Sequence, residues 1–150
     1  MINNNTWKGV WTARVWDKGK LLSEHTYYNV VTLAFRGELT RFLEGSREGS
    51  LAITHQQLGT DNTPANEAQT NLIAPEPDTR QILTSSSIDP NNSNRLIVTA
   101  VWGEGEATGT WQEFGLFVND DILMIRVIID VEVPASGSLT IDGEITQNIT

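Results

Sequence analysis

The chain has 150 residues, no cysteine, and a net charge of −9 from 10 basic and 19 acidic residues. This length fits one domain with a sizeable core, and the absence of cysteine excludes disulfides and thiolate metal sites. The acidic balance argues against nucleic acid and anionic lipid as partners, and no apolar run approaches the ~20 residues of a membrane helix.

The chain begins with a predicted β-hairpin. Residues 7–16 alternate between apolar and polar side chains, which is the pattern of a strand with one buried face. Gly19 lies in the following turn, where its freedom to adopt positive φ is useful. Residues 21–31 are rich in β-branched and aromatic side chains, and we expect them to form the returning strand.

One helix is predicted after the hairpin, at residues 32–45. Thr32 can cap its N-terminus, and Gly45 is a typical C-terminal stop. The apolar side chains that recur at helical spacing are Phe35, Leu39, Phe42 and Leu43. Because a helix this short is marginal alone, we expect this apolar face to pack against the sheet.

The remainder, residues 50–150, is predicted to be a β-sandwich. Residues 51–58 form its first strand, and residues 59–77 form a polar connection. This connection is long for a compact domain, so we expect a functional loop or an arm on a neighbouring molecule. Further strands are predicted at residues 81–88, 96–102, 111–118, 122–131 and 139–146. Together the elements predict one mostly β domain of antiparallel sheets, a sandwich or barrel, with one short helix.

The sequence contains no recognisable catalytic or cofactor motif. Its two histidines, His25 and His55, lie in strand patterns and belong to no metal-binding spacing. Calcium has hard oxygen ligands available at Asp120, Asp121, Asp130 and Glu132. Their spacing is not that of a calcium loop, so solvated turn carboxylates are the preferred interpretation. We therefore expect no enzyme activity, no metal and no cofactor.

Tryptophan is abundant, with five residues in the chain. Trp7 and Trp11 share one face of the first strand, and Trp16 lies on the opposite face. Core anchors are the ordinary interpretation of such large rings. The alternatives are a contact surface for a partner, where tryptophan is enriched, or a platform for stacking sugars.

One charge pair stands out in the C-terminal half. Residues 111–118 carry apolar groups on both faces, so this strand is expected to be covered on both sides. Glu113 would then be partly buried, and Arg126 in the next strand is its obvious partner. We predict a structural ion pair between them. Such a pair fixes the register of the two strands more than it stabilises the fold.

Three segments carry a family resemblance. They are residues 51–67, residues 98–110 and the strand from residue 111 that leads to Arg126 and Val127. The most specific run is Glu106-Ala-Thr-Gly-Thr-Trp111-Gln-Glu113-Phe-Gly-Leu-Phe. These segments resemble a family of small bacteriophage structural proteins described as tail-fibre or virion-associated proteins.

The resemblance implies a virion structural protein without catalysis, namely a tail, neck or fibre-associated adaptor. Its partners would be copies of itself and other virion proteins, and it would be assembled into particles in the host cytoplasm. A capsid-decorating cement protein is the alternative within this class. A carbohydrate-binding module with exposed aromatic side chains is the alternative from another class.

The charge distribution favours an oligomer. Residues 1–50 carry seven basic and five acidic residues, whereas residues 51–150 carry three basic and fourteen acidic residues. The N-terminal part of one copy could therefore attract the acidic remainder of the next copy. A head-to-tail contact of this kind closes by rotation, which predicts a ring or a trimer.

Overall fold

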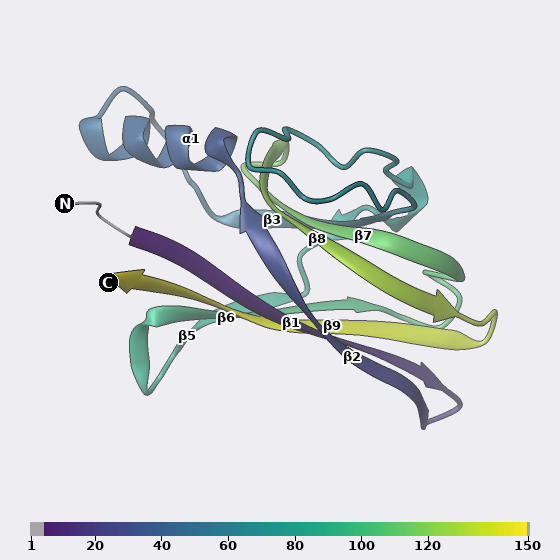
Figure 1. Ribbon diagram of the computed structural model, residues 1–150. Coiled ribbons are helices and arrows are strands. Elements are labelled where there is room, and N and C mark those ends of the chain that lie inside the picture. The colour runs from purple at the N-terminus through teal and green to yellow at the C-terminus, as the bar shows by residue number, and fades with distance from the viewer. Residues whose placement is uncertain (1–4, 150) are drawn as a thin grey trace. The chain divides into compact units, whose positions relative to one another are not determined.

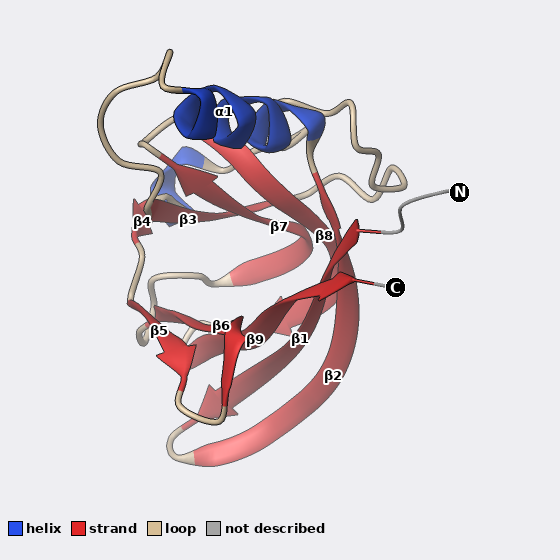
Figure 2. Ribbon diagram, turned by 90° about the vertical axis from the view of Figure 1, so that its left-hand side faces the viewer, coloured by secondary structure: helices blue, strands red, loops and turns tan. Residues whose placement is uncertain are grey.

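A computed structural model describes residues 5–149, and most of them lie in strands (Figure 1). Figure 2 shows the same predominance of strands, with α1 as the α-helix of the described chain. The predicted fold class, mostly β with antiparallel strands and one short helix, is confirmed. The elements are β1 (Asn5–Asp17), β2 (Lys20–Val31), α1 (Leu33–Glu44), β3 (Ile53–Gly59), the 3-10 helix η1 (Pro77–Thr79), β4 (Gln81–Ile82), β5 (Ser85–Asp89), β6 (Asn92–Trp102), β7 (Gly109–Val118), β8 (Ile122–Val133) and β9 (Gly137–Ile149).

The described chain divides into two compact units that alternate along the sequence. Unit 1 comprises residues 5–29, 84–110 and 131–149, and its strands are hydrogen-bonded in the order β5-β6-β9-β1-β2. Unit 2 comprises residues 30–83 and 111–130, and its strands follow the order β4-β3-β7-β8. The boundaries between the units fall inside β2, β7 and β8, and each of these strands has most of its residues in the unit named for it.

The core of unit 1 is organised around Trp11. The alternation predicted for the first strand is observed, because Trp11, Ala13 and Val15 are all buried. Trp11 pairs in register with Gly143 of β9, and a Cβ atom at Gly143 would lie 2.1 Å from the indole ring. A glycine within a strand often marks such a close approach. The indole N–H of Trp11 donates a 2.7 Å hydrogen bond to Asn29 Oδ1.

The helix α1 in unit 2 has the predicted limits. Thr32 caps it by accepting a hydrogen bond from the Phe35 N–H, and Gly45 ends it with a φ of 94°. The Thr32 hydroxyl also donates to the Leu123 carbonyl of β8. The N-terminus of the helix is thereby attached to the sheet of its own unit.

The expected burial of the apolar helix face is wrong. Among its four apolar residues only Phe35 is buried, whereas Phe42 is 43% and Leu43 is 76% exposed. Helical spacing indicates which side chains share a face, but it does not indicate how far the covering surface extends.

We expect Thr32→Ala to lower the free energy of unfolding by about 1–2 kcal/mol, because the helix loses its N-cap. The same change removes the hydroxyl that binds the buried Leu123 carbonyl. Chemical denaturation would measure the change. Thr40→Ala is the matched control, since the Thr40 hydroxyl is exposed and bonds only to its own helix at the Arg36 carbonyl. Equal losses for the two variants would contradict the capping role.

The single strand predicted at residues 81–88 is also wrong. The structure has two short strands there, β4 and β5, separated by Leu83 and Thr84. The Leu83 N–H donates to the Thr54 carbonyl in unit 2. The Thr84 hydroxyl, by contrast, accepts from the Val101 N–H in unit 1. The chain thus changes hydrogen-bonding partner between these two residues, and one continuous strand cannot serve both partners.

Candidate functional site: a buried ion pair that holds a long loop

Glu113 and Arg126 form a buried ion pair in unit 2. Glu113 belongs to β7 and Arg126 to the neighbouring β8, and both side chains are shielded from solvent. Arg126 Nε donates to Glu113 Oε1 over 3.0 Å. The structure therefore brings together the two residues that the sequence pairs. Both faces of β7 are covered, as predicted, since residues 113–118 are all buried.

The Glu113 carboxylate binds the backbone of the long loop as well as Arg126. We call residues 60–76 the anchored loop. Its Ile73 and Ala74 N–H groups each donate to the carboxylate over 2.8 Å, and the Asp61 N–H donates over 3.1 Å. Ionised carboxylates that accept backbone N–H groups form charge-assisted hydrogen bonds, which are stronger than neutral ones. Both oxygens of Glu113 are thus occupied.

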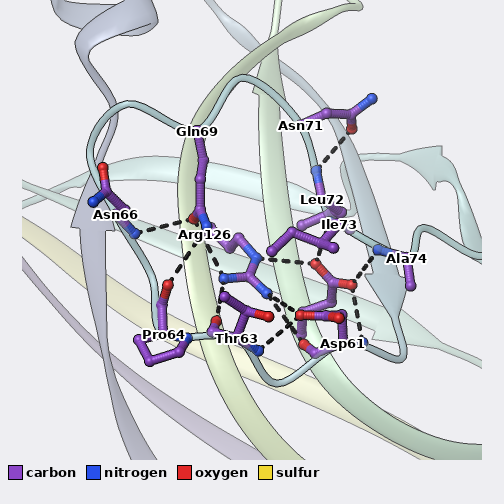
Figure 3. A network of polar contacts seen from close by, with 11 residues as sticks. Asp61, Thr63, Pro64, Asn66, Gln69, Asn71, Leu72, Ile73, Ala74 and Arg126 are labelled. Atoms are coloured by element: carbon purple, nitrogen blue, oxygen red, sulfur yellow. Dashed lines mark hydrogen bonds and ion pairs between the residues drawn. The ribbon is translucent and has the colours of Figure 1, made fainter.

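Arg126 also binds the anchored loop, at Asp61 and at two further residues, as Figure 3 shows. Its Nη1 donates to the Thr63 carbonyl over 2.6 Å and to Gln69 Oε1 over 3.3 Å. Its Nη2 donates to the Asp61 carbonyl over 3.1 Å and lies 3.5 Å from Asp61 Oδ1. The planar guanidinium suits this task because its donors point in several fixed directions.

Two glycines provide space for this arrangement. Gly59 pairs in register with Glu113, and a Cβ atom there would lie 2.6 Å from Glu113 Oε2. A Cβ atom at Gly115 would lie 2.8 Å from Leu72 Cδ2. Leu72 is the apolar contact of the anchored loop, and it packs in a buried cluster with Phe117 and Leu123.

The anchored loop therefore binds its own unit, and the expectation of an arm lying on a neighbouring molecule is wrong for these residues. The loop also binds the helix. The Glu67 carbonyl accepts from the Leu33 N–H over 2.8 Å, and the Glu67 carboxylate pairs with Arg36 at 2.6 Å. Strands, anchored loop and the first turn of α1 are thus joined by one polar network.

Asp61 is a member of this network whose pKa is lowered by its neighbours. The hydroxyl and the backbone N–H of Thr63 hold the pKa of the Asp61 carboxyl below its usual value of 3.8, and Arg126 adds to the effect. A carboxyl whose pKa is lowered by folding stabilises the fold above the unfolded-state pKa. That stabilisation is lost as the pH falls through the folded-state pKa.

We expect Asp61→Asn to reduce the loss of stability on acidification. The free energy of unfolding of the original chain should fall more steeply between about pH 5 and about pH 2 than that of the variant. Urea denaturation at several pH values would measure both slopes. The control is Asp121→Asn, which alters an exposed carboxylate in the turn after β7. Parallel slopes for the original chain and the Asp61 variant would contradict the expectation.

The chemistry of this site is that of attachment. Both charged groups are buried and bonded, so neither presents a free acid, base or nucleophile to a substrate. His25 lies exposed on β2, and His55 Nδ1 lies 3.0 Å from Thr54 Oγ1 and 3.7 Å from the exposed Asp120 carboxylate. Within residues 5–149 no group of three His, Asp or Glu side chains could hold a metal ion.

The tryptophans are distributed differently from the interface prediction. Trp11 is 0% exposed, so it cannot offer its ring to a partner, and this part of the prediction is wrong. The physical reason is that the neighbouring strand β9 carries Gly143 where the ring lies, which leaves room for the ring in the core. Trp7 and Trp16 are partly exposed, and their role as a contact surface stays a prediction.

Opposite charges of the two halves of the sequence meet within one chain. Arg14 pairs with Asp142 at 3.0 Å, and Arg36 pairs with Glu67 at 2.6 Å. These arginines belong to the basic N-terminal part and their partners to the acidic remainder. Part of the opposite charge of the two halves is therefore paired within one chain. This weakens the charge difference as an argument for a head-to-tail oligomer.

Sequence reasoning missed the partners of the ion pair in the anchored loop. The loop contributes mainly backbone N–H and carbonyl groups, which leave no signature in the residue types. Two signals could have pointed to them: a charged residue in an otherwise apolar strand, and a glycine beside it that excludes a side chain.

Comparison with known protein families, curated proteins and solved structures found no match for this chain. No helix among the described residues is long and apolar enough to cross a membrane.

Proposed function

We propose that the chain is a structural subunit of a bacteriophage virion, acting without catalysis as a tail, neck or fibre-associated adaptor. The observation that carries the proposal is the use of Glu113. This residue belongs to the run that resembles virion-associated proteins. Its carboxylate accepts hydrogen bonds from the backbone of the anchored loop and from Arg126. The hydrogen bonds to Glu113 hold the anchored loop in one conformation, and in this proposal the loop presents a fixed surface for assembly.

The surface beside this network suits protein contacts. Ile73 on the anchored loop and Leu33 at the start of the helix are about half exposed, at 45% and 49%. Phe42 and Leu43 are exposed further along α1. Because the loop and the first helical turn are tied to the sheet, a partner would meet a preorganised surface and lose little conformational entropy there.

The test is the copy number of the chain in purified particles of the phage that encodes it. Quantitative mass spectrometry can use the tryptic peptide of residues 21–36, which follows Lys20 and ends at Arg36. A tail or neck subunit forms a closed ring, so we expect from about six to about eighteen copies. Hundreds of copies would instead support the capsid-decorating alternative, and absence from the particle would refute a virion role.

A further inference from the structure

Unit 1 has a shallow groove on its sheet, on the face opposite the Trp11 side chain. The groove has a volume of about 260 Å³ and lies over β1, β6 and β9. Its lining includes the apolar side chains of Val10 and Ile97 and the polar side chains of Thr12, Asp142 and Glu144. This volume is slightly below the usual range for drug-sized ligands, which fits one small ring rather than an extended molecule.

Two arginine–carboxylate clusters border the groove and hold its polar groups in place. On one side Arg14 donates to Asp142 over 3.0 Å and to Glu24 over 2.7 Å. On the other side Arg95 Nε lies 3.5 Å from Glu144. The carboxylates remain 40–52% exposed, so oxygen atoms with unused lone pairs still face the solvent.

An aromatic ring stands beside the groove. Tyr28 pairs in register with Val10, which places the two side chains on the same face of the sheet. The Tyr28 side chain is strongly exposed, at 73%. Such a ring offers an apolar face together with a polar tip, so the groove combines stacking area with fixed hydrogen-bonding groups.

This combination excludes several classes of ligand. Three carboxylates against two arginines leave the site net negative, and together with the chain net charge of −9 this disfavours phosphates and nucleic acid. A metal cation would have to compete with the arginines that already pair with these carboxylates. A purely apolar ligand would bury charged groups without partners, which is costly.

We propose that this groove binds a neutral sugar ring of a glycan. The hydroxyl groups of the sugar donate to Asp142 and Glu144, and its C–H face packs on Val10, Ile97 and Tyr28. A neutral sugar satisfies the exposed carboxylate oxygens without adding charge. The site is independent of the anchored loop and of membership in a particle, since all its residues belong to unit 1.

The test uses the complete chain, carrying a C-terminal epitope tag, on an array of neutral and sialylated glycans. We expect binding to neutral glycans. With ¹⁵N-labelled protein, the glycan that binds best should shift the amide signals of Thr12, Asp142, Gly143 and Glu144. Asp142→Asn and Tyr28→Ala should each weaken binding by at least about tenfold, as expected for losing a charge-assisted hydrogen bond or a stacking surface.

The matched control is Ile88→Ala. Ile88 is 66% exposed on β5 of the same unit, and its neighbour Ser87 pairs with the groove residue Ile97. Ile88 therefore faces the other side of the sheet, and its removal should leave binding unchanged. Circular dichroism must show that all three variants are folded. Because exposed ion pairs contribute little stability, we expect Asp142→Asn to fold like the original chain.

No binding to any glycan, binding to sialylated glycans alone, or signal shifts confined to other residues would overturn the proposal. Unchanged binding by Asp142→Asn and Tyr28→Ala would overturn it as well. Copy number in particles is measured separately, so a failed glycan test leaves the virion proposal standing, and the reverse also holds.

Discussion

Replacing Glu113 with glutamine is expected to lower the free energy of unfolding by about 3–5 kcal/mol, the usual cost of leaving a buried charge without its partner. Arg126 would stay buried and cationic, because arginine does not lose its proton in proteins. The amide of glutamine also presents only one acceptor oxygen, whereas Glu113 accepts from Arg126 and from three backbone N–H groups. Chemical denaturation would measure the loss.

The control for Glu113→Gln is Arg14→Gln, which removes a partly exposed ion pair. Arg14 is 32% and its partner Asp142 40% exposed, so this change should cost no more than about 1 kcal/mol. If Glu113→Gln costs as little as Arg14→Gln, the buried pair does not contribute as described.

A double variant separates the ion pair from the attachment of the loop. Glu113→Leu combined with Arg126→Met removes both charges and should recover part of the stability lost by Glu113→Leu alone. Recovery should be incomplete, because the N–H groups of Ile73 and Ala74 would still lack their acceptor. Hydrogen exchange would detect this directly, since both amides should exchange faster in the double variant.

Replacing Trp11 with alanine is expected to cost about 3–5 kcal/mol, the range for truncating a buried aromatic residue. Trp11 is 0% exposed, and its ring fills the space above Gly143. The change also removes the indole N–H that donates to Asn29. Thermal or urea denaturation would measure the effect, and a loss below about 1 kcal/mol would contradict the central place of Trp11 in unit 1.

The fit between Trp11 and Gly143 can be tested by substituting both residues. Gly143→Ala should cost about 1–3 kcal/mol by overpacking, because the new Cβ atom would collide with the indole ring. In a Trp11→Leu background the same substitution should cost much less, since the smaller side chain leaves room. Equal costs in both backgrounds would show that the ring is not the obstacle.

Gly37→Ala serves as the control for Gly143→Ala. Gly37 lies in α1, and the nearest atom to a Cβ there is Arg41 Nη1 at 3.9 Å. Without a collision, alanine should stabilise the helix by up to about 1 kcal/mol. The same glycine-to-alanine change is thus expected to have opposite signs at the two positions.

Elements whose signals are local could be predicted from the residues alone. Alternating side chains identified the hairpin, Thr32 and Gly45 identified the helix ends, and polar turns separated most of the strands. The sequence also identified Glu113 and Arg126, because a charge within an apolar strand needs a partner. These inferences depend on residue type and spacing along the chain, which the sequence contains in full.

Most of the contacts that these elements make with one another could not be predicted in this way. Glu113 binds backbone N–H groups that every loop possesses, so no residue type could reveal them as its partners. Trp11 is buried because Gly143, more than a hundred positions away, pairs beside it. The helix leaves Phe42 and Leu43 exposed because the rest of the fold covers Phe35 fully and Leu39 only in part. Each outcome depends on which distant segments meet, and that is decided by packing of the whole chain rather than by any local pattern.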